Sequence, residues 1–285
     1  IGILCYYKYF NFFISSFTDF AKNLGFNVDY TPLHIALPLA ISFFTFHILG
    51  YTYDVYQRKY PASNNYFEFI AHIAFFPQLV AGPIERANHL LPQFANKRQF
   101  SWIKMEDGLM QMLWGFFKKI VIADTLATQV NYAFAHYQDL HPITLIIAVI
   151  MFTFQMYCDF SGYSDIALGC ARLLGFELLQ NFNYPFFSTS VSEFWRKWHM
   201  SLSNWIQDYL FTPISFNKRA WGKFGIFYAA LVSFTISGLW HGANWTFIIW
   251  GAVHGIAIGY ELLTKKKRKG WAKKYNPIAY SIGSG

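Results

Sequence analysis

Long runs of apolar residues restrict what this chain can fold into. Residues 142–158, 224–240 and 245–263 are each close to the length of about 20 residues with which a helix crosses a bilayer. Residues 33–53 form another run, which Pro38 is expected to kink, and residues 1–17 resemble the end of one more. Several such runs in one chain predict a polytopic transmembrane helical bundle, since helices satisfy their own backbone hydrogen bonds in lipid.

The composition supports a membrane location. Hydrophobic residues make up 54% of the 285 residues and aromatic residues 21%, whereas charged residues make up only 13%. Soluble domains carry roughly 25% charged residues. Tyr and Trp are typical of the two interfaces of a bilayer. We expect an all-α fold in which residues 1–285 form a single membrane-embedded domain, truncated at one or both ends.

Three shorter segments are predicted to be helices that do not span the bilayer. Residues 66–83 end in Ala-Gly-Pro and are expected to form a half-span or re-entrant piece. Residues 105–127 are interrupted by a Lys-Lys pair and favour an amphipathic helix. Residues 190–211 carry apolar side chains at spacings of three and four, which predicts one helix, capped by Ser192, at an interface or along a polar crevice.

The positive charge is concentrated beside the last apolar run. The net charge is +8, and the segment KKKRK at 265–269 directly follows that run. Cytoplasmic loops carry an excess of Lys and Arg, so this segment and residues 216–223 are predicted to be cytoplasmic. A basic arm for nucleic acid is the alternative, but it would need exposed aromatics on a soluble domain. The predicted partner is therefore the lipid bilayer and not nucleic acid.

Several kinds of active site have no support in this sequence. It contains no HExxH motif, cysteine cluster, Walker loop or GxSxG motif. Asp159 and Asp165 could meet a cation only with help from elsewhere in the chain. We therefore expect no metal site and no bound cofactor.

Two of the nine histidines differ from the rest, because His199 and His241 each directly follow a tryptophan, in KWHMS and LWHGA. Burial at a span end disfavours the imidazolium, so the ring is expected to stay neutral and able to accept a proton. A neutral base suits acyl transfer from a thioester, which is already activated and needs no protein nucleophile. The other seven are assigned to packing or to loops: His34, His47, His72, His89, His136, His141 and His254.

Four stretches of the chain, taken in order, resemble the membrane-bound O-acyltransferase family. They are FFPQLVAGPIER (75–86), the segment 155–186 that contains CDFSGYSDIALG, SVSEFWRKWHMSLSNWIQDYLFTPI (190–214) and SGLWHGANWTFIIWGAVHG (237–255). The resemblance is to the bacterial branch that O-acetylates alginate, which is related to the teichoic acid D-alanyl transferase. Four motifs in the same order are far more specific than one His-Gly pair.

The resemblance implies a multi-pass protein of the bacterial inner membrane with a tunnel between its helices. His241 matches the nearly invariant histidine of the family and is implied to be the general base, and His199 matches the second histidine. The implied donor is acetyl-CoA or another acyl thioester, bound as a substrate and not as a cofactor. The implied acceptor is an extracytoplasmic polysaccharide, and a periplasmic accessory protein completes the acetylation.

Neighbours of these motifs are candidates for substrate binding, on grounds of adjacency alone. The indoles would form walls and the amides would meet an acyl carbonyl or an acceptor hydroxyl; the candidates are Trp195, Trp198, Trp240, Asn181, Asn183, Asn244, Asp159, Ser161, Asp165 and Gln78. Interfacial anchoring is an equal alternative for each tryptophan. For His199, the alternative is that the ring orients its helix through a backbone carbonyl.

Two other functions were weighed against acyl transfer. A transporter or channel with an intramembrane His/Asp relay would show paired acids and bases inside spans and internal repeats, and neither is clear in the sequence. A structural scaffold would show no clustering of polar motifs, whereas the polar residues concentrate in the four stretches. The sequence therefore favours an O-acyltransferase.

Overall fold

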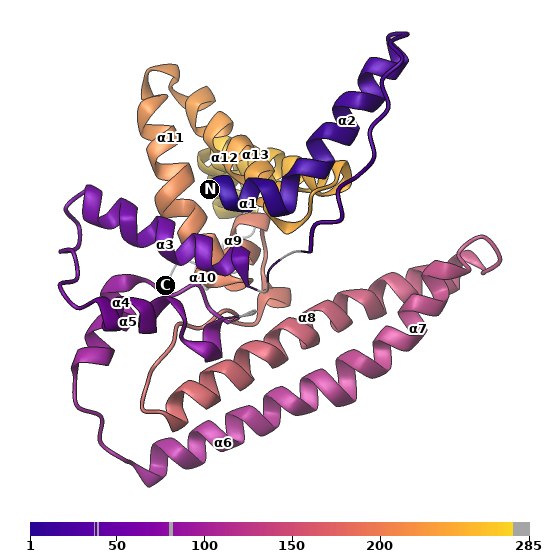
Figure 1. The fold of residues 1–285 in the computed structure, drawn as a ribbon. Helices are drawn as coiled ribbons and strands as arrows, with labels where there is room; N and C mark the ends of the chain where they lie inside the picture. The colour runs from indigo at the N-terminus through magenta and orange to yellow at the C-terminus, as the bar shows by residue number, and fades with distance from the viewer. Residues whose placement is uncertain (37, 39, 80–81, 276–285) are drawn as a thin grey trace. The chain divides into compact units, whose positions relative to one another are not determined.

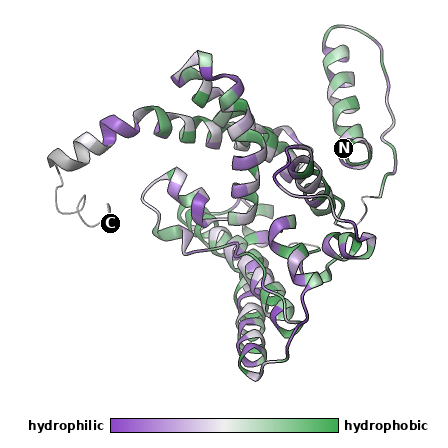
Figure 2. Cartoon of the chain, turned by 90° about the vertical axis from the view of Figure 1, so that its left-hand side faces the viewer, coloured by the Kyte–Doolittle hydropathy of each residue, from purple (hydrophilic) through white to green (hydrophobic). Residues whose placement is uncertain are grey.

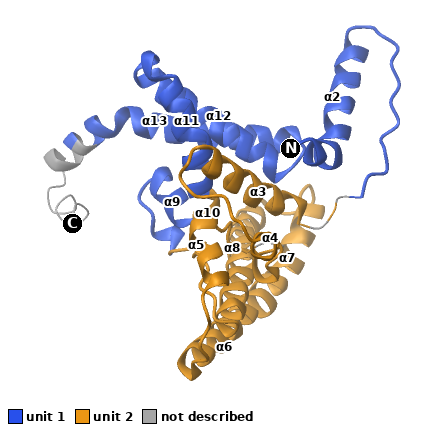
Figure 3. Ribbon diagram, turned by 60° about the vertical axis from the view of Figure 1, so that its left-hand side comes forward, with its two compact units in different colours: residues 1–37, 184–198, 203–285 blue, residues 38–183, 199–202 orange. Residues whose placement is uncertain are grey.

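The chain folds into helices. The computed structural model describes residues 1–36, 38, 40–79 and 82–275, and within these residues every regular element is a helix (Figure 1). The chain divides into two compact units: unit 1 comprises residues 1–37, 184–198 and 203–285, and unit 2 comprises residues 38–183 and 199–202 (Figure 3). The all-α prediction is confirmed for the described residues.

Unit 2 is built around a long helical hairpin. The segments α6 (Trp102–Phe116), η3 (Phe117–Ala123) and α7 (Asp124–Ala135) run on from one another and pack along α8 (Pro142–Leu173). The shorter elements that precede them are α3 (Ile41–Tyr56), α4 (Tyr66–Ile73), η2 (Phe76–Gln78) and α5 (Ala87–Ala95). The apolar core of this unit joins the end of α8 to α5 and to the loop after α8, through Phe75, Leu90, Leu168, Ala171, Phe176 and Leu178.

Unit 1 contains a second antiparallel pair, formed by α12 (Lys223–His241) and α13 (Trp245–Tyr275). Its N-terminal segment is α1 (Gly2–Leu4), η1 (Cys5–Tyr9) and α2 (Phe10–Asn23). The helix α9 (Val191–Lys197) packs against α13. The remaining elements are η4 (Pro185–Phe187), η5 (Gln207–Phe211), α11 (Thr212–Asn217) and η6 (Arg219–Trp221), and α10 (Met200–Ile206) contains the boundary between the units.

Three of the described helices are long and apolar enough to cross a membrane: Pro142–Leu173, Lys223–His241 and Trp245–Arg268. They contain the three runs that the sequence singled out as spans. The first of these helices exposes apolar side chains at many positions of its N-terminal half, between Ile143 and Met156, which suits contact with lipid. Figure 2 shows the third helix changing from apolar to polar where the lysine-rich segment begins.

The prediction for residues 33–53 is corrected by the structure. Its helix, α3, begins only at Ile41 and has 16 residues, so it is not among the candidate spans. Pro38 lies before the helix instead of kinking it. The physical reason is the backbone turn at Ala40, whose φ of 63° lies in the left-handed region and prevents the helix from extending backwards.

Glycines allow the two helices of the unit 2 hairpin to touch along their backbones. A Cβ atom built on Gly115 of α6 would lie 2.6 Å from the carbonyl oxygen of Gly162 in α8, and one built on Gly162 would lie 2.8 Å from the carbonyl oxygen of Gly115. Gly108 and Gly169 meet in the same way two turns away. Small residues of this kind let helices approach closely where no hydrophobic effect drives them together in lipid.

We predict that Gly115→Ala destabilises the protein. The added methyl group has no room, so the hairpin must separate or shift, at a cost of about 1–3 kcal/mol. The measurement is the thermal unfolding midpoint of the full-length protein in detergent. Gly270→Ala is the matched control, because a Cβ atom there has nothing within 4 Å. Equal midpoints for the two variants would contradict the close-packing argument.

Candidate active site

His241 is the last residue of α12, and its ring lies between two indoles. The ring centroids are 4.7 Å from that of Trp240 and 5.2 Å from that of Trp250, both in edge-to-face geometry. The predicted burial of this residue is corrected, since its side chain is exposed at the surface of the described chain. The reason is its place at a helix end. The predicted neutral state of the imidazole stays a prediction.

The connection between α12 and α13 is short, and hydrogen bonds cap the helix end on each side of it. Asn244 accepts hydrogen bonds at its Oδ1 atom from the backbone N–H and the hydroxyl of Thr246, both at 3.0 Å, and so caps the start of α13. Gly242 donates its N–H to the Gly238 carbonyl, which closes the end of α12. The Asn244 side-chain amide, which was predicted to contact substrate, therefore uses its oxygen to cap α13.

Trp195 is the buried anchor of α9. Its indole Nε1–H donates to Nδ1 of His254 at 3.3 Å, and its ring contacts Phe234 and Trp250. It therefore stands in one aromatic cluster with Trp250, the indole that contacts His241. Trp198 packs against the same cluster, and its ring stacks on Phe194 at 5.5 Å.

The start of α9 is held in two ways that the sequence interpretation missed. The cap is Ser190, whose Oγ accepts from the N–H of Glu193 at 3.1 Å, and not Ser192 as predicted. The spacing Ser-x-x-Glu is a sequence signal that identifies this cap. Glu193 bonds Lys197 and the backbone and hydroxyl of Thr189, and these bonds lower its pKa to about 2.

A distant carboxylate completes the capping. Glu261 of α13 accepts the N–H groups of Val191 at 3.0 Å and Ser192 at 2.8 Å. The first backbone N–H groups of a helix have no partner inside it, so this carboxylate satisfies two of them and opposes the positive end of the helix dipole. Since Glu261 lies far along the chain, no local sequence pattern indicates this contact.

His199 interrupts the helix that was predicted over 190–211. α9 ends at Lys197, His199 has a φ of 45°, and α10 starts at Met200. The prediction of one continuous helix is wrong because a left-handed residue cannot be accommodated in a right-handed helix. The imidazole is buried, with 2% exposure, and meets the ring of Phe160 edge to face at 4.6 Å.

The turn at His199 is tied to a loop by Asn181, which is fully buried. The carbonyl of Asn181 accepts the N–H of Met200 at 2.9 Å, and its Oδ1 accepts the hydroxyl of Ser201 at 2.6 Å. Its Nδ2 donates to Ser164 on α8 at 3.2 Å. The Ser201 oxygen in turn accepts the N–H of Ile84 at 2.9 Å. Asn181 therefore positions the turn, whereas Asn183 is exposed.

The polar residues of CDFSGYSD are engaged by two lysines of η3. Lys118 forms an ion pair with Asp165 and donates to the Ser161 hydroxyl at 3.0 Å. Lys119 pairs with Asp159 at 2.6 Å. Ionisable groups are costly in a bilayer unless they are paired. The lysines that interrupt the apolar run 105–127 thus neutralise the acids of the candidate span α8.

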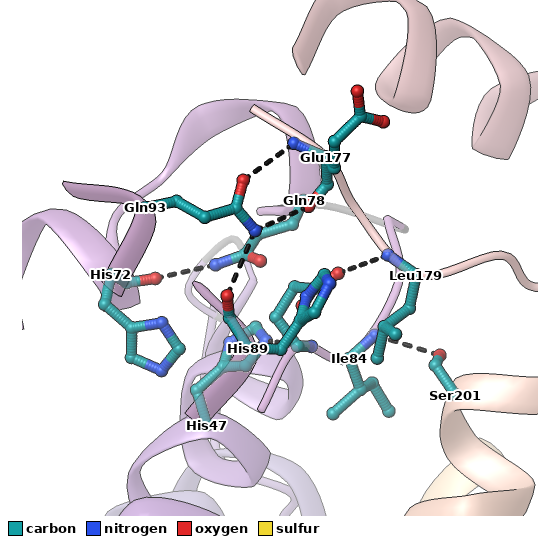
Figure 4. A network of polar contacts seen from close by, with 10 residues as sticks. His47, His72, Gln78, Ile84, His89, Gln93, Glu177, Leu179 and Ser201 are labelled. Atoms are coloured by element: carbon teal, nitrogen blue, oxygen red, sulfur yellow. Dashed lines mark hydrogen bonds and ion pairs between the residues drawn. The ribbon is translucent and has the colours of Figure 1, made fainter. Parts of the chain in front are cut away.

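Gln78 belongs to a buried network that Figure 4 shows. Its Nε2 donates to the backbone carbonyl of His72 at 2.6 Å, and both side chains have 0% exposure. The ring of His47 lies 5.7 Å from that of His72, and its Nε2 accepts the N–H of Glu85 at 3.1 Å. Burial lowers the pKa of His72 to about 4, so its imidazole is neutral. The predicted packing role of these two histidines fits their surroundings.

His89 and Glu85 were missed by the sequence interpretation. His89 was assigned to a loop, but it lies on α5 and its Nδ1 is 2.7 Å from Oε2 of the buried Glu85. That hydrogen bond raises the pKa of His89. The other carboxylate oxygen accepts the N–H of Leu179 at 2.5 Å, so Glu85 fixes the loop that carries Asn181. The spacing of four between Glu85 and His89 is the local signal that indicates the pair.

The predicted site residues are therefore divided between the two units. Unit 1 holds His241, Trp240, Trp195, Trp198 and Asn244. Unit 2 holds His199, Asn181, Asn183, Gln78, Asp159, Ser161 and Asp165. Among the residues that the structure describes, no cluster of three or more His, Cys, Asp or Glu is placed to hold a metal ion.

Comparisons with known proteins agree on one family. The model of the membrane-bound O-acyltransferase family, MBOAT, matches residues 51–269. The chain is 40% identical to the probable alginate O-acetylase AlgI of Pseudomonas putida, over 99% of this chain and 57% of that protein. It is 34% identical to the peptidoglycan O-acetyltransferase of Helicobacter pylori, over 90% and 53%. The teichoic acid D-alanyltransferase of Bacillus subtilis is 32% identical, over 71% and 52%. The chain thus spans about half the length of these relatives.

We predict that Asn181→Ala lowers stability much more than Asn183→Ala. Removing the buried amide leaves the Ser201 and Ser164 hydroxyls without this partner, which costs about 1–3 kcal/mol. The measurement is the thermal unfolding midpoint of the full-length protein in detergent. The exposed Asn183, two residues away, is the control and should stay within about 0.5 kcal/mol of wild type. Equal effects would show that the amide does not hold the turn.

We also predict that the His89–Glu85 pair stabilises the fold at low pH. The pKa of His89 is raised in the folded state, so the stabilisation is complete below the unfolded value of about 6.5 and is lost as the pH rises through the folded value. The test compares the unfolding midpoints of wild type and His89→Gln at about pH 6 and about pH 9. The difference should be larger at the lower pH; a larger difference at the higher pH would contradict the assignment.

Proposed function

The chain belongs to the membrane-bound O-acyltransferase family, and on this premise we propose that the full-length protein moves an acyl group from a cytosolic thioester to hydroxyls of an extracytoplasmic polysaccharide. The match covers residues 51–269, which include most of unit 2, a large part of unit 1 and both candidate histidines. Relatives of similar identity are named for O-acetylation of alginate and of peptidoglycan. Acetyl is therefore the proposed acyl group and acetyl-CoA the proposed donor.

The placement of His241 is the observation that carries the mechanism. The imidazole ends a candidate span and is flanked by Trp240 and Trp250, which leave a ring edge for substrate. In the proposed step a ring nitrogen takes the proton of an acceptor hydroxyl while the hydroxyl oxygen attacks the thioester carbonyl carbon. The carbon–sulfur bond then breaks, and the imidazolium returns the proton to the departing thiolate. No protein nucleophile is consumed.

His199 is proposed as the second functional histidine, on the acceptor side. Its support is its burial and the left-handed backbone that the Asn181 network maintains, because strained residues persist where surrounding contacts hold them in place. The same proposal includes a tunnel, an inner-membrane location and a periplasmic accessory partner, which the family resemblance implies. It also includes the re-entrant pieces and the single domain over both units, which the sequence pattern predicts.

The transport alternative has one observation in its favour. The pairs Lys118–Asp165 and Lys119–Asp159 are the paired bases and acids that a relay in a span requires. The names of the relatives favour transfer. Membranes that contain the full-length protein, incubated with labelled acetyl-CoA and the polysaccharide, separate the two functions, since only the transferase labels the polymer.

We predict that His241→Ala lowers acetyl transfer by about 10²–10⁴-fold, the usual contribution of a positioned base. His241→Gln should be nearly as inactive, because its amide can bond the hydroxyl but cannot accept the proton. Wild-type activity should fall in acid as the imidazole becomes protonated. The measurement is the initial rate of labelled acetyl transfer in membranes.

The control for this prediction is His136→Ala, an exposed histidine at the end of α7, which should keep full activity. Substantial activity in His241→Gln would mean that the ring orients the hydroxyl and does not take its proton.

A further inference from the structure

A lysine of the N-terminal segment reaches the end of α12. The Nζ atom of Lys8 donates a hydrogen bond to the carbonyl of Trp240, the residue directly before His241. The same ammonium lies 5.3 Å from the centroid of the Trp240 ring, in cation–π geometry. The C-terminal carbonyls of a helix lack internal partners and carry the negative end of its dipole, so a cation is stabilised at this point.

The contact is part of a larger interface within unit 1. Phe12 packs on the ring of Trp245 at a centroid distance of 5.6 Å, and the indole N–H of Trp245 donates to the hydroxyl of Ser16 at 3.2 Å. Residues 8, 12 and 16 are spaced by four and so share one face of the N-terminal helix. This face contacts the residues on both sides of the turn that contains His241, so the placement of Lys8 is fixed by more than one interaction.

Among the described contacts at this end of α12, the charged partner of Trp240 is Lys8. The Lys8 ammonium also lies 5.8 Å from the centroid of the Tyr9 ring, and α13 brings His254 beside Trp250. Burial lowers the pKa of Lys8 to about 8, which still leaves its ammonium charged at pH 7. A fixed positive charge disfavours a second one nearby. The imidazole of His241 therefore gains its proton less readily in the presence of Lys8.

We propose that Lys8 is a positioning residue for the transfer reaction: it holds the last peptide of α12 through the Trp240 carbonyl and keeps a positive charge beside the imidazole, so that His241 remains a proton acceptor. This inference rests on the proposed role of His241 as the base. Lys8 acts through His241 and is not assigned a contact with substrate.

The test is the pH profile of acetyl transfer by the full-length protein in membranes. Lys8→Gln keeps a hydrogen-bond donor but removes the charge, and it should move the acid limb to higher pH by about half to one unit. On the acid side of the limb, where the rate falls about tenfold per pH unit, this displacement lowers the rate by about three- to tenfold. Lys8→Arg keeps both the charge and the donor, and its limb should coincide with that of wild type. The position of the limb does not depend on how much protein folds.

Lys22→Gln is the matched control. Lys22 lies on the same N-terminal helix but pairs with Asp29 at 2.9 Å in an exposed position, so its loss should leave the limb unchanged. A Lys8→Gln profile that superimposes on wild type, or a Lys8→Arg limb displaced as far as that of Lys8→Gln, would overturn the proposal. Wild-type rates in His241→Ala would instead overturn the base assignment itself, which separates the two failures.

Discussion

The need to satisfy polar groups away from water is the constraint on which the rest of this structure depends. Helices meet it for the backbone, and the glycine contacts between α6 and α8 then let two helices pack without side chains between them. The same constraint explains the charges. A carboxylate on the candidate span α8 is tolerated because Lys118 lies opposite it on η3 and bonds both Asp165 and Ser161.

Irregular segments face the same constraint and meet it through buried side chains. The loop after α8 cannot satisfy its backbone groups within a helix, so side chains bond to it or from it. Asn181 bonds to the turn at His199, and Glu85 accepts the N–H of Leu179. In unit 1, Glu261 does the same for the start of α9. Buried polar groups that are fully bonded specify one arrangement, so these residues fix the backbone around the candidate residues.

The sequence predicts the elements whose signal is local. The three spans follow from the lengths of their apolar runs, and the place of His241 at a helix end follows from the Gly-Ala-Asn that succeeds it. The cap at Ser190 has a local signal in Ser-x-x-Glu that competes with the nearby Ser192. The break at His199 could not be predicted, because periodicity continues across it. The left-handed turn is held through Met200 and Ser201 by Asn181 and Ile84, which lie in other parts of the chain.

The hydrogen bonds that cap the α12–α13 turn do not involve the side chain of His241. The end of α12 is satisfied by Gly242 and by the Lys8 ammonium, and the start of α13 is satisfied by Asn244. These bonds cap both helices through groups other than the His241 imidazole. The residue is exposed, and packing between Trp240 and Trp250 does not by itself call for an imidazole. The proposed role of His241 as a proton acceptor gives a reason for the residue that capping does not.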